Sequence, residues 1–142
     1  MKRVILILVM SIMGMSSAMA ADNAGYVTDT VKFINYERAK TGALPLGTLA
    51  PLSCAAQTLV ADIGGKYICQ SVPTDGTSPW ELPRRCGGLA YGLFVGCGFQ
   101  TPELAVNGWR QRSDISAMML NPKFRTIGVA MLNNYCVVFL GI

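Results

Sequence analysis

The sequence lacks the side chain on which much hydrolytic chemistry depends, because none of its 142 residues is a histidine. A serine or cysteine nucleophile usually needs an adjacent histidine to remove its proton. A pair of carboxylates can act instead as general acid and base, and Glu37 and Asp62 are candidates on predicted helices. None of the acids stands in a recognised catalytic spacing. We therefore expect no catalytic residues and keep a hydrolase of unknown type only as an alternative.

The first twenty residues have the organisation of a secretory signal peptide. Lys2 and Arg3 precede an apolar run over residues 4–15, and Ala18, Met19 and Ala20 form a cleavage motif before Ala21. The run is shorter than the roughly 18–20 apolar residues of a membrane span. We expect a signal peptide over residues 1–20 and one domain over 21–142, secreted or periplasmic, with no membrane span after cleavage.

The charge of the mature chain argues against nucleic acid as a partner. The whole sequence has 12 basic and 8 acidic residues, and removing Lys2 and Arg3 leaves 10 against 8, a net charge of +2. Phosphate binding needs several Lys or Arg side chains on one face. The basic residues cluster only at Arg84–Arg85 and at Arg110 and Arg112, so we expect no nucleic-acid binding.

Five cysteines lie in the predicted mature chain, and an exported protein normally pairs its cysteines. Five is odd, so at most two disulfides form within the chain. Cys86 and Cys97 bracket the segment GGLAYGLFVG and are our candidate pair. Cys136 stands in an apolar run and fits a buried thiol. No C-x-x-C spacing occurs, so neither a redox motif nor a zinc knuckle is indicated.

Two helices are predicted in the first half of the mature chain. The first covers about residues 25–40, with apolar side chains three and four residues apart and a glycine, Gly42, after its end. The second starts at Pro51 and is expected to end at Gly64–Gly65. Its apolar stripe consists of Leu52, Ala56, Leu59 and Ile63. The segment GALPLGTLAP between the helices is expected to be a loop.

The second half combines helices with a terminal hairpin. Thr101 and Pro102 are typical of a helix start, and Ser113 or Asp114 is expected to cap a short helical turn that ends before Asn121–Pro122. The apolar runs FRTIGVAML and YCVVFLGI predict two strands joined at Asn133–Asn134. The last strand is apolar on both faces and needs cover on both. The pattern predicts an α+β layered sandwich.

Three segments in order resemble the CAP superfamily, the SCP domains of cysteine-rich secretory, antigen-five and pathogenesis-related type-one proteins. They are FINYERAKTGALPL, LSCAAQTLVADI and AVNGWRQRSDISAMMLNPKFRTIGVAM. Together they cover most of the mature chain. The resemblance implies a three-layer α-β-α sandwich with a central antiparallel sheet, and an extracellular or periplasmic location.

The metal site of many family members does not carry over. Those members place two histidines and two glutamates around a cleft that can hold a divalent cation. Aligned through Ala56–Gln57, the first histidine position falls on Leu59, and the second, aligned back from Leu120–Asn121–Pro122, falls on Ile115. One glutamate position falls at Gly88 or Leu89, and the fourth position finds no counterpart. Zinc needs imidazole, thiolate or carboxylate ligands, so we expect neither a metal nor another cofactor.

The function that remains is binding, and the long region from Lys66 to Gln100 is the candidate surface. We expect a non-catalytic module that binds a protein partner in an envelope or secretion assembly, because Trp and Arg often carry interface energy. The candidate surface residues are Trp80, Arg84, Arg85, Tyr91 and Phe94.

An apolar ligand is the alternative, because the resemblance includes sterol and lipid binders. Segment GGLAYGLFVGCGF with Trp80, Met118 and Met119 could line a groove. For the two methionines we favour an ordinary place in the core.

The loss of the metal ligands leads to a first prediction. The melting temperature of the mature protein should be the same with micromolar zinc and with a chelator, because Leu59 and Ile115 offer no ligand atom. Differential scanning calorimetry checks this. A melting temperature that rises with zinc and falls with chelator would contradict the assignment of both positions.

Overall fold

The computed structural model describes residues 23–142, and the predicted signal peptide lies outside the described residues. A first helix covers residues 23–40. The remaining elements follow in the order β1 (Gly47–Thr48), α2 (Ala50–Lys66), α3 (Glu81–Arg85), β2 (Gly92–Cys97), α4 (Pro102–Arg110), α5 (Ser113–Leu120), β3 (Thr126–Leu132) and β4 (Tyr135–Gly141). In the part of the chain from residue 23 onward, no helix combines the length and hydropathy needed to cross a membrane.

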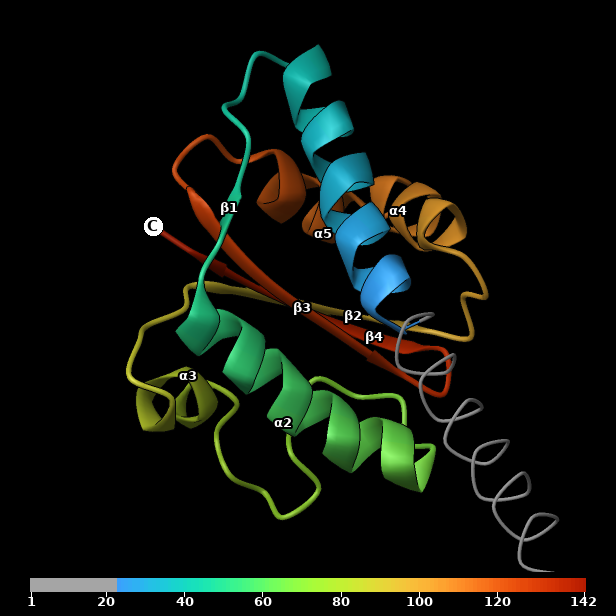
Figure 1. The fold of residues 1–142 in the computed structure, drawn as a ribbon, viewed down its shortest axis with the longest axis vertical. Coiled ribbons are helices and arrows are strands. Elements are labelled where there is room, and N and C mark those ends of the chain that lie inside the picture. Colours follow the sequence, from blue (N-terminus) through green and yellow to red (C-terminus); the bar gives the residue numbers. More distant parts are fainter. Residues whose placement is uncertain (1–22) are drawn as a thin grey trace, which may run out of the picture.

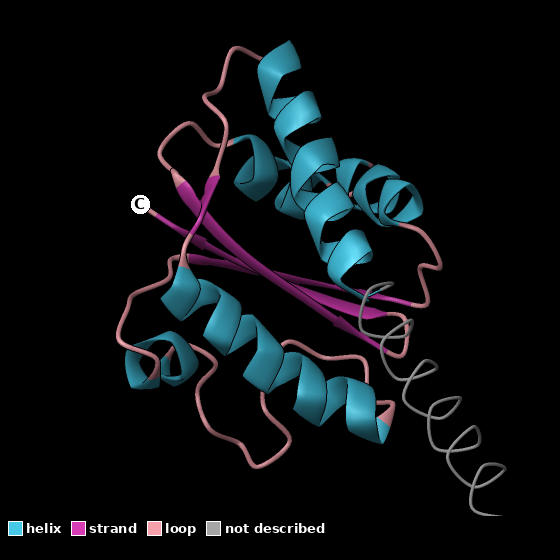
Figure 2. Cartoon of the chain, viewed as in Figure 1, coloured by secondary structure: helices cyan, strands magenta, loops and turns pink. Residues whose placement is uncertain are grey.

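The four strands form one sheet between two layers of helices, in the order β1-β3-β4-β2 (Figures 1 and 2). Helix 23–40, α4 and α5 lie on one face, and α2 and α3 lie on the other. The pairs β3–β4 and β4–β2 are antiparallel. The predicted three-layer α-β-α sandwich is confirmed.

β1 is an addition to the predicted sheet. The segment GALPLGTLAP was expected to be a loop, but Gly47 and Thr48 pair in parallel with Thr126 and Ile127 of β3. Both residues of β1 are exposed. A strand of two exposed residues has no alternation of buried and exposed side chains, so the sequence pattern does not predict it.

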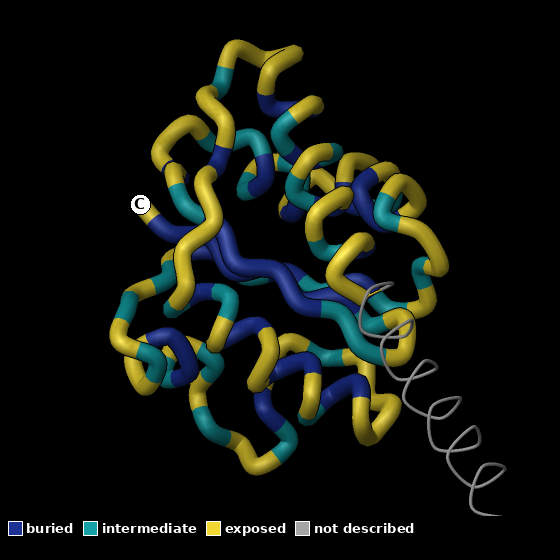
Figure 3. Tube along the Cα trace, viewed as in Figure 1, coloured by how far each residue is buried: buried dark blue, intermediate teal, exposed yellow. Residues whose placement is uncertain are grey.

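The last strand has two buried faces, as predicted. Cys136, Val138 and Leu140 pack in the cluster beneath helix 23–40, α4 and α5. Val137 and Phe139 pack in the cluster beneath α2. The buried strands run through the centre of the molecule in Figure 3. The hairpin turn is confirmed too, since Asn133 and Asn134 have φ values of 52° and 63°, the left-handed region that a two-residue hairpin requires.

Helix α2 buries its predicted stripe but ends later than expected. Leu52, Ala56, Leu59 and Ile63 are all fully buried. The helix continues through Gly64–Gly65 to Lys66 and is capped by Tyr67 at a φ of 55°. A Cβ at Gly64 would lie 3.0 Å from the carbonyl oxygen of Leu132. Gly64 therefore allows the hairpin to approach α2 and does not terminate the helix.

The caps of the next two helices match the prediction in one case and not in the other. The Thr101 hydroxyl accepts a hydrogen bond from the backbone N–H of Leu104 at 3.2 Å, as expected for the start of α4. In α5, Ser113 is the first helical residue, and Arg112 occupies the cap position without a capping side chain. The prediction that Ser113 or Asp114 is the cap is therefore wrong, although the end before Asn121–Pro122 is confirmed.

The predicted disulfide between Cys86 and Cys97 is wrong. The bridges are Cys54–Cys86 and Cys69–Cys97. Cys86 directly follows α3, which packs against α2 and so lies beside Cys54, whereas Cys97 lies at the far end of β2. Within the described residues Cys136 is unpaired and buried, as expected.

A buried arginine joins helix 23–40 to the turn between α5 and β3. The Arg38 guanidinium donates to the Leu44 carbonyl at 2.8 Å, to those of Met119 and Asn121 at 2.9 and 3.0 Å, and to that of Phe124 at 3.0 Å. Arg38 has no exposed surface. One side chain thus supplies hydrogen-bond donors to four backbone carbonyls, one in the loop after helix 23–40 and three in residues 119–124.

This arrangement predicts that Arg38→Met destabilises the fold by roughly 3–5 kcal/mol, because four carbonyls lose their donor together. Urea denaturation followed by circular dichroism measures the change. Arg112→Met is the matched control, since Arg112 is exposed and pairs with an equally exposed Asp114, and it should change stability by less than about 1 kcal/mol. Equal effects of the two substitutions would contradict the structural role of Arg38.

Candidate binding surface

The positions that the resemblance aligned with metal ligands are packed against other residues. Leu59 is fully buried in the cluster beneath α2, and Ile115 is buried in the cluster on the opposite face. A Cβ at Gly88 would lie 2.6 Å from the Cβ of Pro51, so a glutamate does not fit there without movement. Among the described residues, no group of three or more His, Cys, Asp or Glu side chains is arranged to hold a metal ion.

The segment from Cys69 to Thr74 borders two hollows, one lined by Leu59 and the other by Ile115. Leu59 lines a hollow together with Pro73 and Thr74, while Ile115 lines a different hollow together with Cys69 and Gln70. The Cys69–Cys97 disulfide fixes one end of the segment to β2. The segment therefore contributes to the lining of both hollows.

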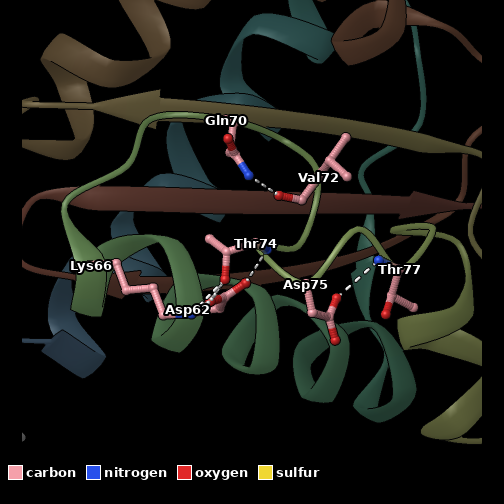
Figure 4. Close-up of polar contacts among 7 residues, drawn as sticks. All are labelled: Asp62, Lys66, Gln70, Val72, Thr74, Asp75 and Thr77. Carbon is pink, nitrogen blue, oxygen red and sulfur yellow. Dashed lines mark hydrogen bonds and ion pairs between the residues drawn. The ribbon is translucent and has the colours of Figure 1, made fainter.

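A polar cluster fixes the other end of this segment to α2 (Figure 4). The Asp62 carboxylate accepts from the backbone N–H of Thr74 at 2.7 Å and from its hydroxyl at 2.6 Å, and it pairs with Lys66 at 3.0 Å. These hydrogen bonds favour the charged carboxylate and lower the pKa of Asp62 to about 2. Beyond Thr74, Asp75 accepts from the backbone N–H of Thr77. Hydrogen bonds to the side chain and to the backbone of Thr77 lower the pKa of Asp75 as well.

Three of the five predicted surface residues come together around one hollow. The hollow has a volume of about 430 Å³ and is lined by Trp80, Arg84, Leu89, Ala90 and Tyr91, which we call the aromatic–arginine surface. The exposed fractions are 41% for Trp80, 54% for Leu89 and 56% for Tyr91. Leu89 was not predicted as a surface contact, although it lies in the apolar GGLAYG segment that suggested a groove.

Two predicted surface residues lie elsewhere. Arg85 follows Arg84 on a short helix and points to a separate hollow that it lines together with Asp62 and Asp75. Phe94 is only 3% exposed, and its ring packs edge-to-face on Trp109 at a centroid distance of 4.8 Å. Side chains alternate between the two faces of β2, and Phe94 falls on the face toward α4. Phe94 is therefore a core residue.

The aromatic–arginine surface is held by covalent and packing contacts. Trp80 directly precedes α3, Arg84 belongs to it, and Cys86 after it is bonded to Cys54 of α2. Leu82 of α3 is buried against α2. Glu81 pairs with Arg84 at 3.2 Å. A surface fixed in this way loses little conformational freedom when it binds.

The residues proposed for an apolar groove lie mostly in the core. Met119 is fully buried, and Met118 is partly buried against the same cluster, which agrees with the core interpretation of both methionines. Trp80 lies in the aromatic–arginine surface, in a hollow that neither methionine lines. The predicted groove residues therefore do not form one continuous lining.

The candidate pair of catalytic carboxylates is not assembled. Glu37 lies on helix 23–40 and Asp62 lies on α2, and these helices cover opposite faces of the sheet (Figure 1). Glu37 is engaged by Arg110 at 3.2 Å and by Lys40 at 3.3 Å. It borders a hollow of about 590 Å³ between helix 23–40 and α4 that carries charges of both signs.

Comparison with known families gives one match that covers most of the chain. The model of the cysteine-rich secretory protein family, CAP, matches residues 31–140. The uncharacterized protein YkwD of Bacillus subtilis is 31% identical over 115 residues, which is 78% of this chain and 44% of YkwD. The chain therefore spans less than half the length of that relative.

Solved structures share the fold at low identity. An extracellular protein of Bacillus anthracis containing an SCP domain superposes with a TM-score of 0.78 at 13% identity, over 83% of this chain and 40% of that chain. A cysteine-rich secretory protein of Staphylococcus aureus gives 0.70 at 16% identity, over 83% and 38% of the two chains. An outer surface protein of Borrelia burgdorferi gives 0.68 at 18% identity, over 78% and 87%.

The Asp62 cluster predicts a defined loss of stability in acid. The pKa of Asp62 is lower in the folded protein than the ordinary value of 3.8. The charged Asp62 carboxylate therefore gives its full stabilisation of the fold above about pH 4, and this stabilisation is lost as the pH falls toward about 2. Asp62→Asn should lower the melting temperature at pH 7. Between about pH 4 and pH 2 the melting temperature of this variant should fall less than that of the wild type, as measured by differential scanning calorimetry. Asp114→Asn, at an exposed ion pair, is the control, and an equal flattening in the control would contradict the assignment.

Proposed function

Because the chain belongs to the cysteine-rich secretory protein family, CAP, we propose that it is a secreted, non-catalytic member that binds a protein partner. The partner belongs to an envelope or secretion assembly. The contact is made by the aromatic–arginine surface of Trp80, Arg84, Leu89, Ala90 and Tyr91. The observation that carries the proposal is the convergence of these exposed side chains on one disulfide-anchored hollow.

Three observations support a location outside the cytoplasm. The sequence begins with the pattern of a signal peptide. Two disulfides link α2, the segment after it, the end of α3 and β2, and disulfides persist mainly in oxidising compartments. Structures with the same fold come from an extracellular protein and an outer surface protein.

The absence of histidine supports a function without catalysis. Leu59 and Ile115 stand where many family members have histidines, and both are buried packing residues. The acids Glu37 and Asp62 are each held in ion pairs, on opposite faces of the sheet. Asp75 lines the same hollow as Asp62, but hydrogen bonds lower the pKa of both carboxylates, so neither is suited to act as a general acid at neutral pH.

The composition of the surface favours a protein partner. Trp, Tyr and Arg are the side chains that most often dominate interface energy, especially near the centre of a contact. Here one residue of each type borders the same hollow, with Leu89 adding exposed apolar area. Neighbouring exposed apolar side chains of this kind mark interaction sites more often than isolated ones.

The test begins by identifying the partner through a photo-crosslinking amino acid placed at Tyr91 in the exporting cells. The affinity of the purified partner is then measured by isothermal titration calorimetry. Trp80→Ala and Arg84→Ala should each weaken binding by at least about tenfold, with unchanged melting temperature. Tyr36→Ala is the matched control, because Tyr36 is 62% exposed and lies on the opposite helical layer.

A different set of outcomes would overturn the proposal. Binding that is unchanged in both alanine variants removes the aromatic–arginine surface from the contact. If the protein instead takes up labelled fatty acid or sterol, with slower dissociation for longer chains, the apolar ligand replaces the protein partner.

A further inference from the structure

We propose that the hollow between helix 23–40 and α4 binds a short peptide whose two termini are free. The hollow has a volume of about 590 Å³, which is in the usual range for sites that take small ligands. Ten residues of the two helices line it, and six of them are charged. It lies on the helical layer opposite α3, so it is separate from the aromatic–arginine surface and does not depend on it.

Two contacts fix how the two helices lie beside each other. The Tyr26 hydroxyl donates to the Phe99 carbonyl at 2.9 Å, just before α4 begins. At the other end, the guanidinium of Arg110, the last residue of α4, pairs with Glu37 at 3.2 Å. The start of α4 therefore lies beside the start of helix 23–40, and its end lies beside the last turn of that helix. The hollow between them has two distinct ends.

The end where the helices start is acidic. Asp29 and Glu103 line the hollow there, and Lys32 follows Asp29 by about one helical turn. All three side chains are exposed, and within residues 23–142 none of them belongs to an ion pair. With two negative charges and one positive charge, this end has a net charge of −1 and two carboxylates that are available to a cation.

The other end is basic, and a buried carboxylate holds its cations in place. Glu37 is only 9% exposed, and its two oxygens pair with Arg110 at 3.2 Å and with Lys40 at 3.3 Å. The Lys40 ammonium also lies 4.5 Å from the centre of the Tyr36 ring. The Arg110 and Lys40 side chains are nonetheless about half exposed, and each has N–H donors that Glu37 does not use. With two positive charges and one negative charge, this end has a net charge of +1 and is preorganised for an anion.

Apolar side chains lie between the two charged ends. Val106 of α4 is buried, Phe33 is half-buried, and Tyr36 is exposed. They provide a base on which an apolar side chain of a ligand can pack. Asn107, which is exposed beside them, has an amide that can both donate to and accept from a peptide group.

The order of acidic, apolar and basic parts matches a ligand with an ammonium group at one end and a carboxylate at the other. A helix advances 1.5 Å per residue, so the charged ends are about 10 Å apart from Glu103 to Arg110 and about 16 Å apart from Asp29 to Lys40. An extended peptide spans about 3.3–3.6 Å per residue, so about three to five residues join the two ends. A single amino acid is too short, and a fatty acid has no positive group for the acidic end. The inferred ligand is therefore an extended peptide of this length.

Nuclear magnetic resonance of the isotope-labelled mature protein tests the site directly. The probes are synthetic peptides of three, four and five residues, with alanine at both ends and phenylalanine or leucine between. We expect saturable chemical-shift changes at the amides of Phe33, Asn107 and Arg110. Acetylating the amino terminus or amidating the carboxyl terminus should each lower the affinity by at least about threefold, because each removes one charge pair.

Two substitutions assign the ends of the peptide to the ends of the hollow. Glu103→Gln should lower the affinity for the free peptide by about two- to fivefold, and it should leave the affinity for the acetylated peptide unchanged. Lys40→Gln should lower the affinity for the free peptide similarly and leave that for the amidated peptide unchanged. Asp114→Asn is the matched control, because Asp114 is exposed and does not line this hollow, and it should bind every peptide as the wild type does.

Three outcomes would overturn the inference. In the first, no peptide causes saturable changes at the three amides. In the second, peptides blocked at both ends bind as tightly as free ones, so the hollow takes an internal segment of a protein. In the third, only a fatty acid causes the changes, so the ligand is apolar. None of these results bears on the aromatic–arginine surface, which lies on the other helical layer and has its own test.

Discussion

The fully buried guanidinium of Arg38 meets a need that helix α5 cannot meet alone. The last carbonyls of any helix have no partner within it, and α5 has only eight residues before Asn121 ends it. Arg38 donates to two carbonyls at this end and to a third, at Phe124, where the chain turns into β3. Burial lowers the pKa of Arg38, but an ordinary pKa far above neutrality keeps the guanidinium charged. The start of the longest strand pair therefore has a fixed position relative to helix 23–40.

On the other face, α2 provides the support for the candidate surface. The helix approaches the sheet so closely that a Cβ at Gly128 would lie 2.1 Å from the carbonyl carbon of Leu52. On this fixed helix, Cys54 forms a disulfide with Cys86 at the end of α3. Asp62 accepts two hydrogen bonds from Thr74. The region between α2 and β2 has few strands or helices of its own, and these two attachments keep it ordered. Because of these attachments to α2, the side chains of the aromatic–arginine surface are exposed on a backbone of fixed position.

The parts of the structure that local pattern determines could be predicted from the sequence. The stripe of Leu52, Ala56, Leu59 and Ile63, the turn at Asn133–Asn134 and the two apolar faces of β4 each follow from spacing within one segment. The disulfides could not be predicted, because Cys54 meets Cys86 only after α3 packs on α2. Phe94 was misplaced for a related reason. Its apolar neighbours on both sides made β2 ambiguous, and only the register with β4 assigns its ring to the face toward α4.

The unpaired Cys136 has a consequence for how the chain acquires its two bridges. Only a thiolate attacks a disulfide, and burial in the finished sheet raises the pKa of Cys136 to about 12. At neutral pH the sulfur in the native molecule is almost entirely protonated and takes no part in exchange. In the unfolded chain it has the reactivity of an ordinary thiol and competes with the other four cysteines. The β3–β4 hairpin and the helices above it therefore protect the two bridges, Cys54–Cys86 and Cys69–Cys97, from exchange with the fifth sulfur in the folded protein.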